Sequence, residues 1–475
     1  MSHKARVYWT FAITSVGVFM VTLDNLVVTT ALPVIRTDLH ASIENLEWTV
    51  NAYTLTFAVL LLTGAALGDR FGRKRMFVFG LSVFTLASAA AALAPSIDAL
   101  VAARAAQGVG GAIIAPLTLT LLSAAVPAEK RGLALGAWGG IGGLAVALGP
   151  LVGGAVVSGL SWQWIFWINV PLGLVLIPLA SRRLDESHGP SGKLDLPGLA
   201  LVSLGLLGIV WGLVRGNGQG WSSPEIVSAL VGGAVLLVAF VLWELRTTAP
   251  MLPMRFFRNR TFSATNVASL LMFFGMFGSI FLLAQFFVSI QGYTPFQSGL
   301  RILPWTAMPI FVAPIAGALS DRIGGQRIMA VGLSLQAVGL AWIATVSNPT
   351  VAYSALVPGF VLSGIGMGLF FAPVANIVLS AVRPQEEGQA SGANNAIREL
   401  GGVFGVAVLA SIFSANGSYV TGQAFVDGMI PALRVGAVFV ALGAVAALAI
   451  TARTRVATDE AEAEAYDFAD AGAAA

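Results

Sequence analysis

The chain of 475 residues contains no cysteine, only three histidines and few charged side chains. Without cysteine, disulfides, thiol catalysis and thiolate metal sites are excluded. His3, His40 and His188 fall at the amino terminus or in expected connecting segments, so we expect neither a metal site nor a buried histidine relay. Asp, Glu, Lys and Arg make up 10% of the residues, against about 25% in a soluble domain. The chain therefore lacks the polar surface that a water-soluble fold requires.

Hydrophobic residues make up 57% of the chain instead, and the mean hydropathy is +0.83. A helix needs about 20 apolar residues to cross the hydrocarbon of a bilayer, and the sequence has no runs of alternating polarity that would favour strands. We therefore predict an all-α polytopic membrane protein with 14 transmembrane helices. The predicted spans are 8–32, 48–68, 76–94, 99–122, 132–158, 164–181, 196–214, 224–243, 262–287, 298–320, 327–346, 351–379, 389–413 and 431–451.

The positions of the basic residues indicate how these helices are oriented. With the amino terminus in the cytoplasm, 20 of the 26 lysines and arginines fall on cytoplasmic segments, which is the bias that orients membrane proteins. The exceptions on the outer side are Arg36, Arg215, Arg301 and Arg434. Both termini are thus predicted to be cytoplasmic, in the cell (inner) membrane. The net charge of +3 reflects this bias, and we expect no nucleic-acid partner.

Two parts of the sequence, about half a chain apart, resemble each other. The segment 64–75 (GAALGDRFGRKR) is echoed by 316–327 (AGALSDRIGGQR), and 107–116 (QGVGGAIIAP) is echoed by 363–373 (SGIGMGLFFAP). Glycines of the fifth and thirteenth helices recur 256 residues apart: Gly136 with Gly392, and Gly149 with Gly405. The first six helices are therefore predicted to pair with the last six.

This repeat predicts the division of the chain into parts. Two parallel six-helix halves are the architecture of transporters that rock around a central site, and the seventh and eighth helices are then an insert. The predicted parts are an N-terminal six-helix half (1–181), a linker with the two inserted helices (182–260), a C-terminal six-helix half (261–452) and an acidic, disordered tail (453–475).

The loop between the second and third predicted helices carries Asp69, Arg70, Gly72 and Arg73, which match the pattern G-x-L-x-D-R-x-G-R-K with Ala65 at its first position. On this pattern the chain resembles the Major Facilitator Superfamily, in particular its fourteen-helix drug:proton antiporter branch. The resemblance implies that the loop gates the transport cycle, and an acid at a helix start can accept free N–H groups. The alternative is that its basic residues only set orientation. The repeat extends the gating role to Asp321 and Arg322.

A second pair of charges lies inside the apolar spans. Arg104, in LVAARAAQGVGGA, is costly within a membrane and should have a partner, and the segment LDNLVVTTALP offers Asp24. From the rise of a helix, Asp24 lies roughly 12 Å and Arg104 roughly 8 Å below the outer surface. The resemblance implies that this pair couples transport to protons, whereas the alternative is a static buried ion pair.

The proposed coupling follows from two opposing effects on a buried carboxyl. Burial favours its neutral form, and a nearby guanidinium favours its charged form. If Arg104 approaches Asp24 in only one conformation, the acid loads a proton outside and releases it inside. Substrate that competes for the same cavity then completes an antiport cycle.

The fifth predicted helix, GAWGGIGGLAVALGPLVGGAVV, is similar to the signature that marks exporters within the family. Small residues allow close helix packing, and a proline removes one backbone hydrogen bond, so this helix can bend. The residues that carry the signature are Gly136, Gly149, Pro150, Gly153 and Gly154. The following segment SWQWIFWINVPLG resembles the same branch, although its tryptophans are also typical of an interfacial belt.

Arg398 and Glu399 lie near the middle of the thirteenth predicted helix and form a possible second charged site. Because adjacent helical residues point in different directions, we expect them to take different partners. Polar and aromatic side chains on several helices are candidates for a substrate cavity, with the alternative that the phenylalanines face lipid. They are Asn51, Tyr53, Phe57, Gln107, Phe277, Phe281, Gln285 and Asn394.

These features predict a proton-coupled antiporter that exports small lipophilic or monocationic compounds by alternating access, without a cofactor other than protons, and as a monomer in the bilayer. Export of polycations is disfavoured because only Asp24 and Glu399 lie deep in the spans. The alternative is a proton-coupled transporter of one specific metabolite or nutrient. An enzyme is not expected, since the sequence has no P-loop, no His/Cys cluster and no paired carboxylates.

Overall fold

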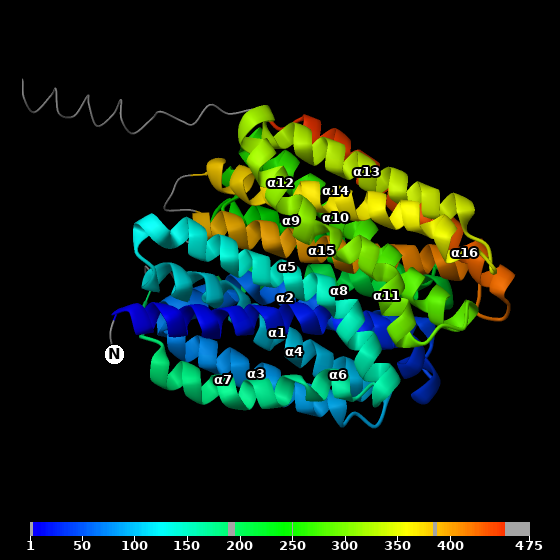
Figure 1. Cartoon of the computed structure of the whole chain (residues 1–475), viewed down its shortest axis with the longest axis horizontal. Helices are drawn as coiled ribbons and strands as arrows, with labels where there is room; N and C mark the ends of the chain where they lie inside the picture. Colours follow the sequence, from blue (N-terminus) through cyan, green and yellow to red (C-terminus); the bar gives the residue numbers. More distant parts are fainter. Residues whose placement is uncertain (1–2, 189–194, 249, 383–386, 452–475) are drawn as a thin grey trace, which may run out of the picture.

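The structure, a computed structural model, describes residues 3–188, 195–248, 250–382 and 387–451, and every regular element in these ranges is a helix. The helices run side by side along the molecule as one bundle (Figure 1). The first group is α1 (His3–Asp38), α2 (Ile43–Phe71), α3 (Arg73–Ala92), α4 (Ile97–Ala125), α5 (Ala128–Gly159), α6 (Trp164–Trp167) and α7 (Asn169–Arg183). Two helices, α8 (Leu196–Gln219) and α9 (Pro224–Glu244), follow. The last group is η1 (Met254–Arg258), α10 (Arg260–Gln285), η2 (Phe286–Ile290), α11 (Pro295–Thr306), α12 (Met308–Ile323), α13 (Gly325–Val346), α14 (Tyr353–Ser380), α15 (Glu387–Asn416) and α16 (Gly422–Leu448).

Twelve helices of the described residues are long and apolar enough to cross a membrane. A thirteenth span results if α2, which bends by 50° between Leu61 and Thr63, is counted as one. Helix α5 contributes a shorter apolar segment, Leu148–Gly159. The prediction of an all-helical polytopic protein is confirmed, while the predicted number of 14 exceeds the twelve or thirteen that meet this criterion.

Two predicted spans each comprise two helical elements. The span predicted at 164–181 consists of α6 and α7, which are separated by Ile168, and the span predicted at 298–320 consists of α11 and α12, which meet at Ala307. Both linking residues have helical backbone angles, and the two pairs count as single candidate spans, Trp164–Arg183 and Pro295–Gly317. Asn169, directly after the turn at Ile168, is buried inside the protein.

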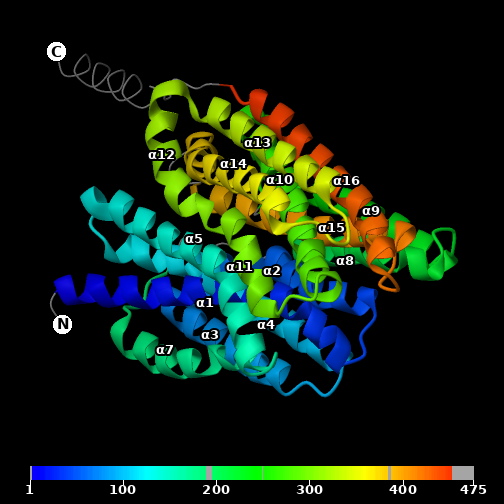
Figure 2. The same cartoon turned by 45° about the vertical axis from the view of Figure 1, so that its right-hand side comes forward.

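The start of α1 and the end of α16 lie at the same end of the bundle (Figure 2). At this end, Arg6 pairs with Asp185 at 2.8 Å, so the segment after α7 is tied to the beginning of α1. The hydroxyl groups of Thr261 and Thr451 lie 2.9 Å apart, which ties the beginning of α10 to the end of α16. We call the opposite end, where α1 ends and α11 begins, the far end.

Helix α5 packs on α1 in the way that α15 packs on α10. A methyl group at Gly149 would lie 2.6 Å from the Cβ atom of Leu26, and one at Gly401 would lie 2.3 Å from the carbonyl oxygen of Leu270. One turn further along α5 and α15, two more glycines lie against a neighbouring backbone. Gly153 lies against Val27 on α1, and Gly405 lies against Phe274 on α10. The two halves of the repeat therefore share this close packing of a glycine-rich helix on a neighbouring backbone.

These contacts also bear on the register of the predicted repeat. The pairs Gly149 with Gly401 and Gly153 with Gly405, each 252 residues apart, make similar contacts with α1 and α10. The predicted correspondence of Gly149 with Gly405, at 256 residues, differs from this pairing by about one helical turn. The offset of 252 is the one that separates Asp69 from Asp321. Glycines recur every few positions in both helices, so the sequence alone allows several registers.

Helix α8 lies across the contact between α2 and α15. A buried apolar cluster joins side chains of all three helices: Leu55 and Val59 from α2, Leu206, Val210 and Val214 from α8, and Val403 and Ala407 from α15. The side-chain amide of Asn217 on α8 donates to the hydroxyl of Ser411 on α15 at 3.0 Å. On the other side, Trp211 of α8 packs against Trp48 of α2, with ring centroids 5.7 Å apart.

Candidate functional site

Asp24 on α1 and Arg104 on α4 form an ion pair deep in the first group of helices. Asp24 is 2% exposed and Arg104 is fully buried. The sequence predicted these two side chains at similar depth, and the structure places them in direct contact. A pair removed from water in this way is costly unless further hydrogen bonds satisfy both groups. The surrounding contacts therefore decide what the pair can do.

The carboxylate of Asp24 accepts two more hydrogen bonds besides that of Arg104. The side-chain amide of Gln107 donates to Oδ1 at 3.1 Å, and the side-chain amide of Asn169 donates to the same oxygen at 2.8 Å. Gln107 also donates to the hydroxyl of Ser88 on α3 at 2.7 Å. Helices α4 and α7 thus both donate to one carboxylate of α1, and α3 is joined to it only through Gln107.

Arg104 has partners of its own that do not involve Asp24. Its Nε–H donates to the backbone carbonyl of Thr49 at 3.1 Å, and its Nη1 donates to the side-chain oxygen of Gln107 at 2.9 Å. The guanidinium carbon lies 4.2 Å from the ring centroid of Tyr53, within the range of a cation–π contact. Two of the three guanidinium nitrogens therefore have partners other than Asp24, whereas Nη2 is buried without one.

Three members of this network were not predicted from the sequence. Asn169 lies in the segment that resembles the family, but nothing in the sequence shows that its side chain points to Asp24. Ser88 is one of many small polar residues in the apolar spans. Thr49 contributes only its backbone carbonyl. Their roles depend on the rotation of each helix about its own axis, which the spacing of residues does not give.

Arg398 and Glu399 take different partners, as their adjacent positions predict. The guanidinium carbon of Arg398 lies 4.5 Å from the ring centroid of Phe273, and Arg398 also donates to the side-chain oxygen of Asn395 at 3.1 Å. The carboxyl of Glu399 accepts a hydrogen bond from the side-chain amide of Asn25. Since Asn25 directly follows Asp24, the second charged site of α15 lies next to the first one on α1.

The loop between α2 and α3 differs in one respect from the prediction. Asp69 does not accept the free N–H groups of α3 but pairs with Arg73 at 2.8 Å. The free groups go to Glu186, whose carboxylate accepts the backbone N–H of Lys74 at 2.9 Å and that of Arg75 at 3.3 Å. The capping acid thus comes from the segment after α7, 112 residues away in the chain.

The two loops that the repeat relates each contain a glycine with the same backbone conformation. Gly72, between α2 and α3, has a φ of 104°, and Gly324, between α12 and α13, has a φ of 91°. Such positive values favour glycine. Arg70 is exposed at the end of α2. Asp321 and Arg322 lie in the last turn of α12, and their side chains lie outside the described part of the structure.

The predicted signature of α5 makes contacts with both groups of helices. Gly149 and Gly153 face α1, as described above, whereas a methyl group at Gly154 would lie 2.4 Å from the carbonyl oxygen of Pro295 on α11. A methyl group at Gly299 of α11 would lie 2.1 Å from the carbonyl oxygen of Pro150. Helix α5 is thus pressed between the two groups near the far end. Gly136 lies in the first half of α5.

The phenylalanines expected near a cavity face the interior rather than lipid. Phe277 and Phe281 are 5% and 1% exposed, and Phe277 stacks on Phe273 with centroids 5.7 Å apart. On α2, Tyr53 stacks on Phe57 at 5.9 Å. These rings therefore belong to the apolar core around the two charged sites.

The polar candidates divide into those with partners and one without. Asn394 donates to Asn266 at 2.9 Å, so it joins α15 to α10. The side chain of Gln285 accepts from Tyr419, whose ring also lies 3.7 Å from the guanidinium carbon of Arg36. Asn51 is fully buried, and neither its side-chain oxygen nor its nitrogen has a hydrogen-bond partner. Among these candidates Asn51 is therefore the one with an unsatisfied buried amide, which is uncommon in a folded protein.

Residues 14–406 match the Major Facilitator Superfamily. Over 416 residues the chain is 33% identical to the tetracenomycin C resistance and export protein of Streptomyces glaucescens, an alignment that covers 87% of this chain and 77% of that protein. It is 35% identical over 409 residues to the multidrug resistance protein Stp of Mycobacterium tuberculosis, covering 86% and 76%. It is 36% identical to the cephamycin export protein CmcT of Amycolatopsis lactamdurans, covering 84% of each.

Solved structures share the fold at lower sequence identity. A POT family transporter in complex with a thioalcohol-conjugated peptide superposes with a TM-score of 0.70 at 14% identity, covering 93% of this chain and 96% of that one. An inward-facing bacterial homologue of the human lysosomal transporter Spinster superposes with a TM-score of 0.66 at 17% identity, covering 95% and 98%. At such identities the likeness concerns the fold alone.

Proposed function

Because the chain belongs to the Major Facilitator Superfamily, a family of transporters rather than enzymes, we propose that it is a proton-coupled antiporter that exports small lipophilic or monocationic compounds by alternating access. It works as a monomer in the cell membrane, with 14 spans and both termini in the cytoplasm. It takes a small molecule as substrate, binds no nucleic acid and uses no cofactor other than protons. The observation that carries this proposal is the buried network around Asp24.

The export direction is supported by the relatives and by α5. The names of three similar proteins refer to resistance or export, and α5 has small residues where the exporter signature requires them. Gly154 and Gly299 allow the backbones of α5 and α11 to touch at the far end. Such a contact between the two halves can open and close without breaking interlocked side chains.

The orientation is supported by the contacts at the end where α1 starts. Arg6, Lys74 and Glu186 lie at this end, and the basic residues of the α2–α3 loop belong to the cytoplasmic side by the positive-inside rule. The far end is then the outer one. The two halves meet there through Arg36 and Tyr419, as well as through α5 and α11, so these contacts part when the protein opens outward.

Proton exchange is supported by the separate partners of Arg104. When Asp24 takes up a proton it no longer balances the charge of Arg104, which would be very costly for an isolated pair. Here the guanidinium keeps the carbonyl of Thr49, the amide of Gln107 and the ring of Tyr53. The network therefore tolerates both charge states of the carboxyl, which a static ion pair would not require.

Glu399 extends the proposed proton coupling from the first half to the second. Its hydrogen bond to Asn25 joins α15 to α1 beside Asp24, so a rocking motion that separates the halves breaks this bond. A cation held between Asp24 and Glu399 meets at most two acidic groups, which favours monocationic over polycationic substrates. The unpartnered amide of Asn51 and the buried aromatic rings suit a largely apolar compound with one polar group.

The experiment that tests this function is efflux in inverted membrane vesicles. With ethidium as the probe, an acidic vesicle interior should drive accumulation of the dye inside the vesicle, and dye uptake should release protons from it. Collapse of the pH gradient with an ionophore should stop both. Dye movement in the opposite direction under the same gradient would contradict export.

A further inference from the structure

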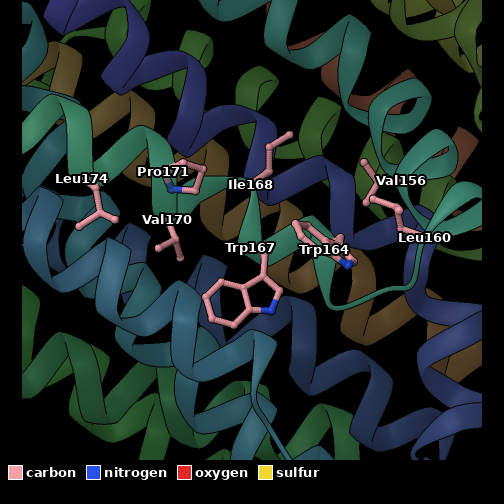
Figure 3. Close-up of a pocket in the computed structure, with 8 residues that line it drawn as sticks. All are labelled: Val156, Leu160, Trp164, Trp167, Ile168, Val170, Pro171 and Leu174. Atoms are coloured by element: carbon pink, nitrogen blue, oxygen red, sulfur yellow. The ribbon is translucent and has the colours of Figure 1, made fainter.

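An apolar groove lies beside the Asp24 network, on the outside of the helix bundle. It has a volume of about 430 Å³, within the 300–1,000 Å³ that is usual for ligand pockets. Figure 3 shows its lining, which comes from the end of α5, from α6 and from the start of α7: Val156, Leu160, Trp164, Trp167, Ile168, Val170, Pro171 and Leu174. All eight side chains are apolar or aromatic.

The mouth of this groove faces the membrane. Leu160 and Leu174 are each 64% exposed, and Trp164 is 49% exposed, on a span of which only 33% is buried within the protein. From Trp164 to Leu174 the chain rises about 15 Å along α6 and α7. A bilayer has about 30 Å of hydrocarbon, so the groove is about as deep as one leaflet.

The lining decides what can occupy the groove. A drug or a lipid headgroup would have to lose water without gaining a polar partner, which is unfavourable, whereas a hydrocarbon chain needs none. In a membrane the acyl chains surround the protein at very high concentration, so mass action also favours them. The occupant is therefore an acyl chain rather than an exported compound.

The groove is connected to the charged network through a single residue. Ile168 and Val170 line it, and Asn169 between them points inward and donates to Asp24 at 2.8 Å. The other end of this segment is also tied to α1, because the indole N–H of Trp162 donates to Asp38 at 2.6 Å. Whatever fills the groove packs against the two residues that position Asn169.

We propose that the groove binds one phospholipid acyl chain, and that this chain, packed against Ile168 and Val170, holds the α6–α7 turn in the position from which Asn169 reaches Asp24. The leaflet is the outer one if the orientation given above holds, and only the link to proton exchange rests on the proposed function. When the groove is occupied, Asn169 stays in place as a donor to the carboxylate. When the groove is empty, this segment can shift and the hydrogen bond weakens.

Lipid binding is tested on the full-length protein by native mass spectrometry in detergent, with added phosphatidylethanolamine that carries two 18-carbon monounsaturated chains. Val156→Trp fills the groove, and Val238→Trp, on the exposed face of α9, adds the same ring to a flat surface. We expect the lipid-bound fraction to fall at least threefold in Val156→Trp and to stay at the wild-type level in Val238→Trp. Equal retention in both variants would overturn the proposal.

A second variant keeps the test decisive if the added ring disturbs folding. Leu160→Asn places an amide at the mouth without adding bulk, and it should lower the lipid-bound fraction by a similar factor. Unchanged binding in well-folded Leu160→Asn protein would also overturn the proposal. Because neither assay measures transport, a protein that binds the lipid but exchanges no protons would contradict the proposed function alone.

Discussion

Asn169, the first residue of α7, donates its side-chain hydrogen bond to Oδ1 of Asp24 across 145 positions of the sequence. This contact links α7 to the carboxyl that is buried with Arg104. It also means that three donors from two helices, α4 and α7, hold one charge in place. The arrangement explains how a carboxylate can be stable inside a membrane protein and still be sensitive to small movements of its neighbours.

Asn169→Ala should alter transport more than folding. Loss of one donor leaves the Asp24 carboxylate less well positioned, because Asn169 joins α7 to it. We expect the transport rate to fall severalfold, while the free energy of unfolding falls by no more than about 1 kcal/mol. Asn169→Gln, which restores an amide on a longer side chain, should recover part of the rate. An unchanged transport rate in well-folded Asn169→Ala protein would contradict a positioning role.

The capping of α3 by Glu186 predicts a stability effect that is separate from transport chemistry. Glu186→Ala removes the acceptor of two backbone N–H groups and should lower the free energy of unfolding by about 1 kcal/mol. Glu186→Gln keeps an acceptor oxygen and should lose less. Thermal unfolding of the detergent-solubilised protein measures both. If Asp69→Asn were the more destabilising change and Glu186→Ala had no effect, the assignment of the cap would be wrong.

Three glycines of α5 offer a matched series. Gly153→Ala places a methyl group 2.3 Å from the hydroxyl of Thr30 on α1, and Gly154→Ala places one 2.4 Å from Pro295 on α11, whereas a methyl group at Gly142 meets nothing within 4 Å. We expect Gly153→Ala to lower thermal stability, because α1 and α5 belong to the same half. Gly154→Ala should lower the transport rate severalfold with little loss of stability, and Gly142→Ala should change neither. Equal effects of all three would contradict the assigned contacts.

The absence of cysteine allows a direct test of how α8 moves. Its hydrogen bond runs from Asn217 to Ser411 on α15, and its contact with α2 is the ring pair Trp48–Trp211. We expect α8 to move with the second half, because its side-chain hydrogen bond is to α15, so a cross-link between Asn217→Cys and Ser411→Cys should leave transport intact. A cross-link between Trp48→Cys and Trp211→Cys should stop transport reversibly. The opposite pattern would show that α8 moves with α2.

Much of this arrangement is predictable from the sequence. The rest is not predictable, and the reason is physical. Depth along a helix follows from residue count, so Asp24 and Arg104 were placed at similar depth and are indeed in contact. Rotation about the helix axis does not follow from residue count, and therefore Asn169 and Ser88 were not recognised. The register between α5 and α15 does not follow from the sequence either, because repeated glycines give several equivalent alignments that differ by about one turn.

The wrong prediction of the acid that caps α3 has a similar origin. Asp69 was expected to cap α3 because it is close in sequence, but the nearest charge to Asp69 is Arg73, one turn away. Glu186 lies far along the chain and comes close only because α7 returns beside α3 to the same end. A local pattern thus identified the right loop and the wrong acceptor.

The central claim is that Asp24 carries the exchanged proton, and one measurement tests it most directly. Purified protein is reconstituted into vesicles with a trapped pH indicator, and ethidium movement and proton movement are recorded together for the wild type and for Asp24→Asn. The asparagine keeps hydrogen bonds to its neighbours, and Arg104 retains Thr49 and Tyr53, so the variant should fold. We predict that Asp24→Asn abolishes ethidium-driven proton movement and the response to a pH gradient. Full proton-coupled exchange in the variant would contradict the account.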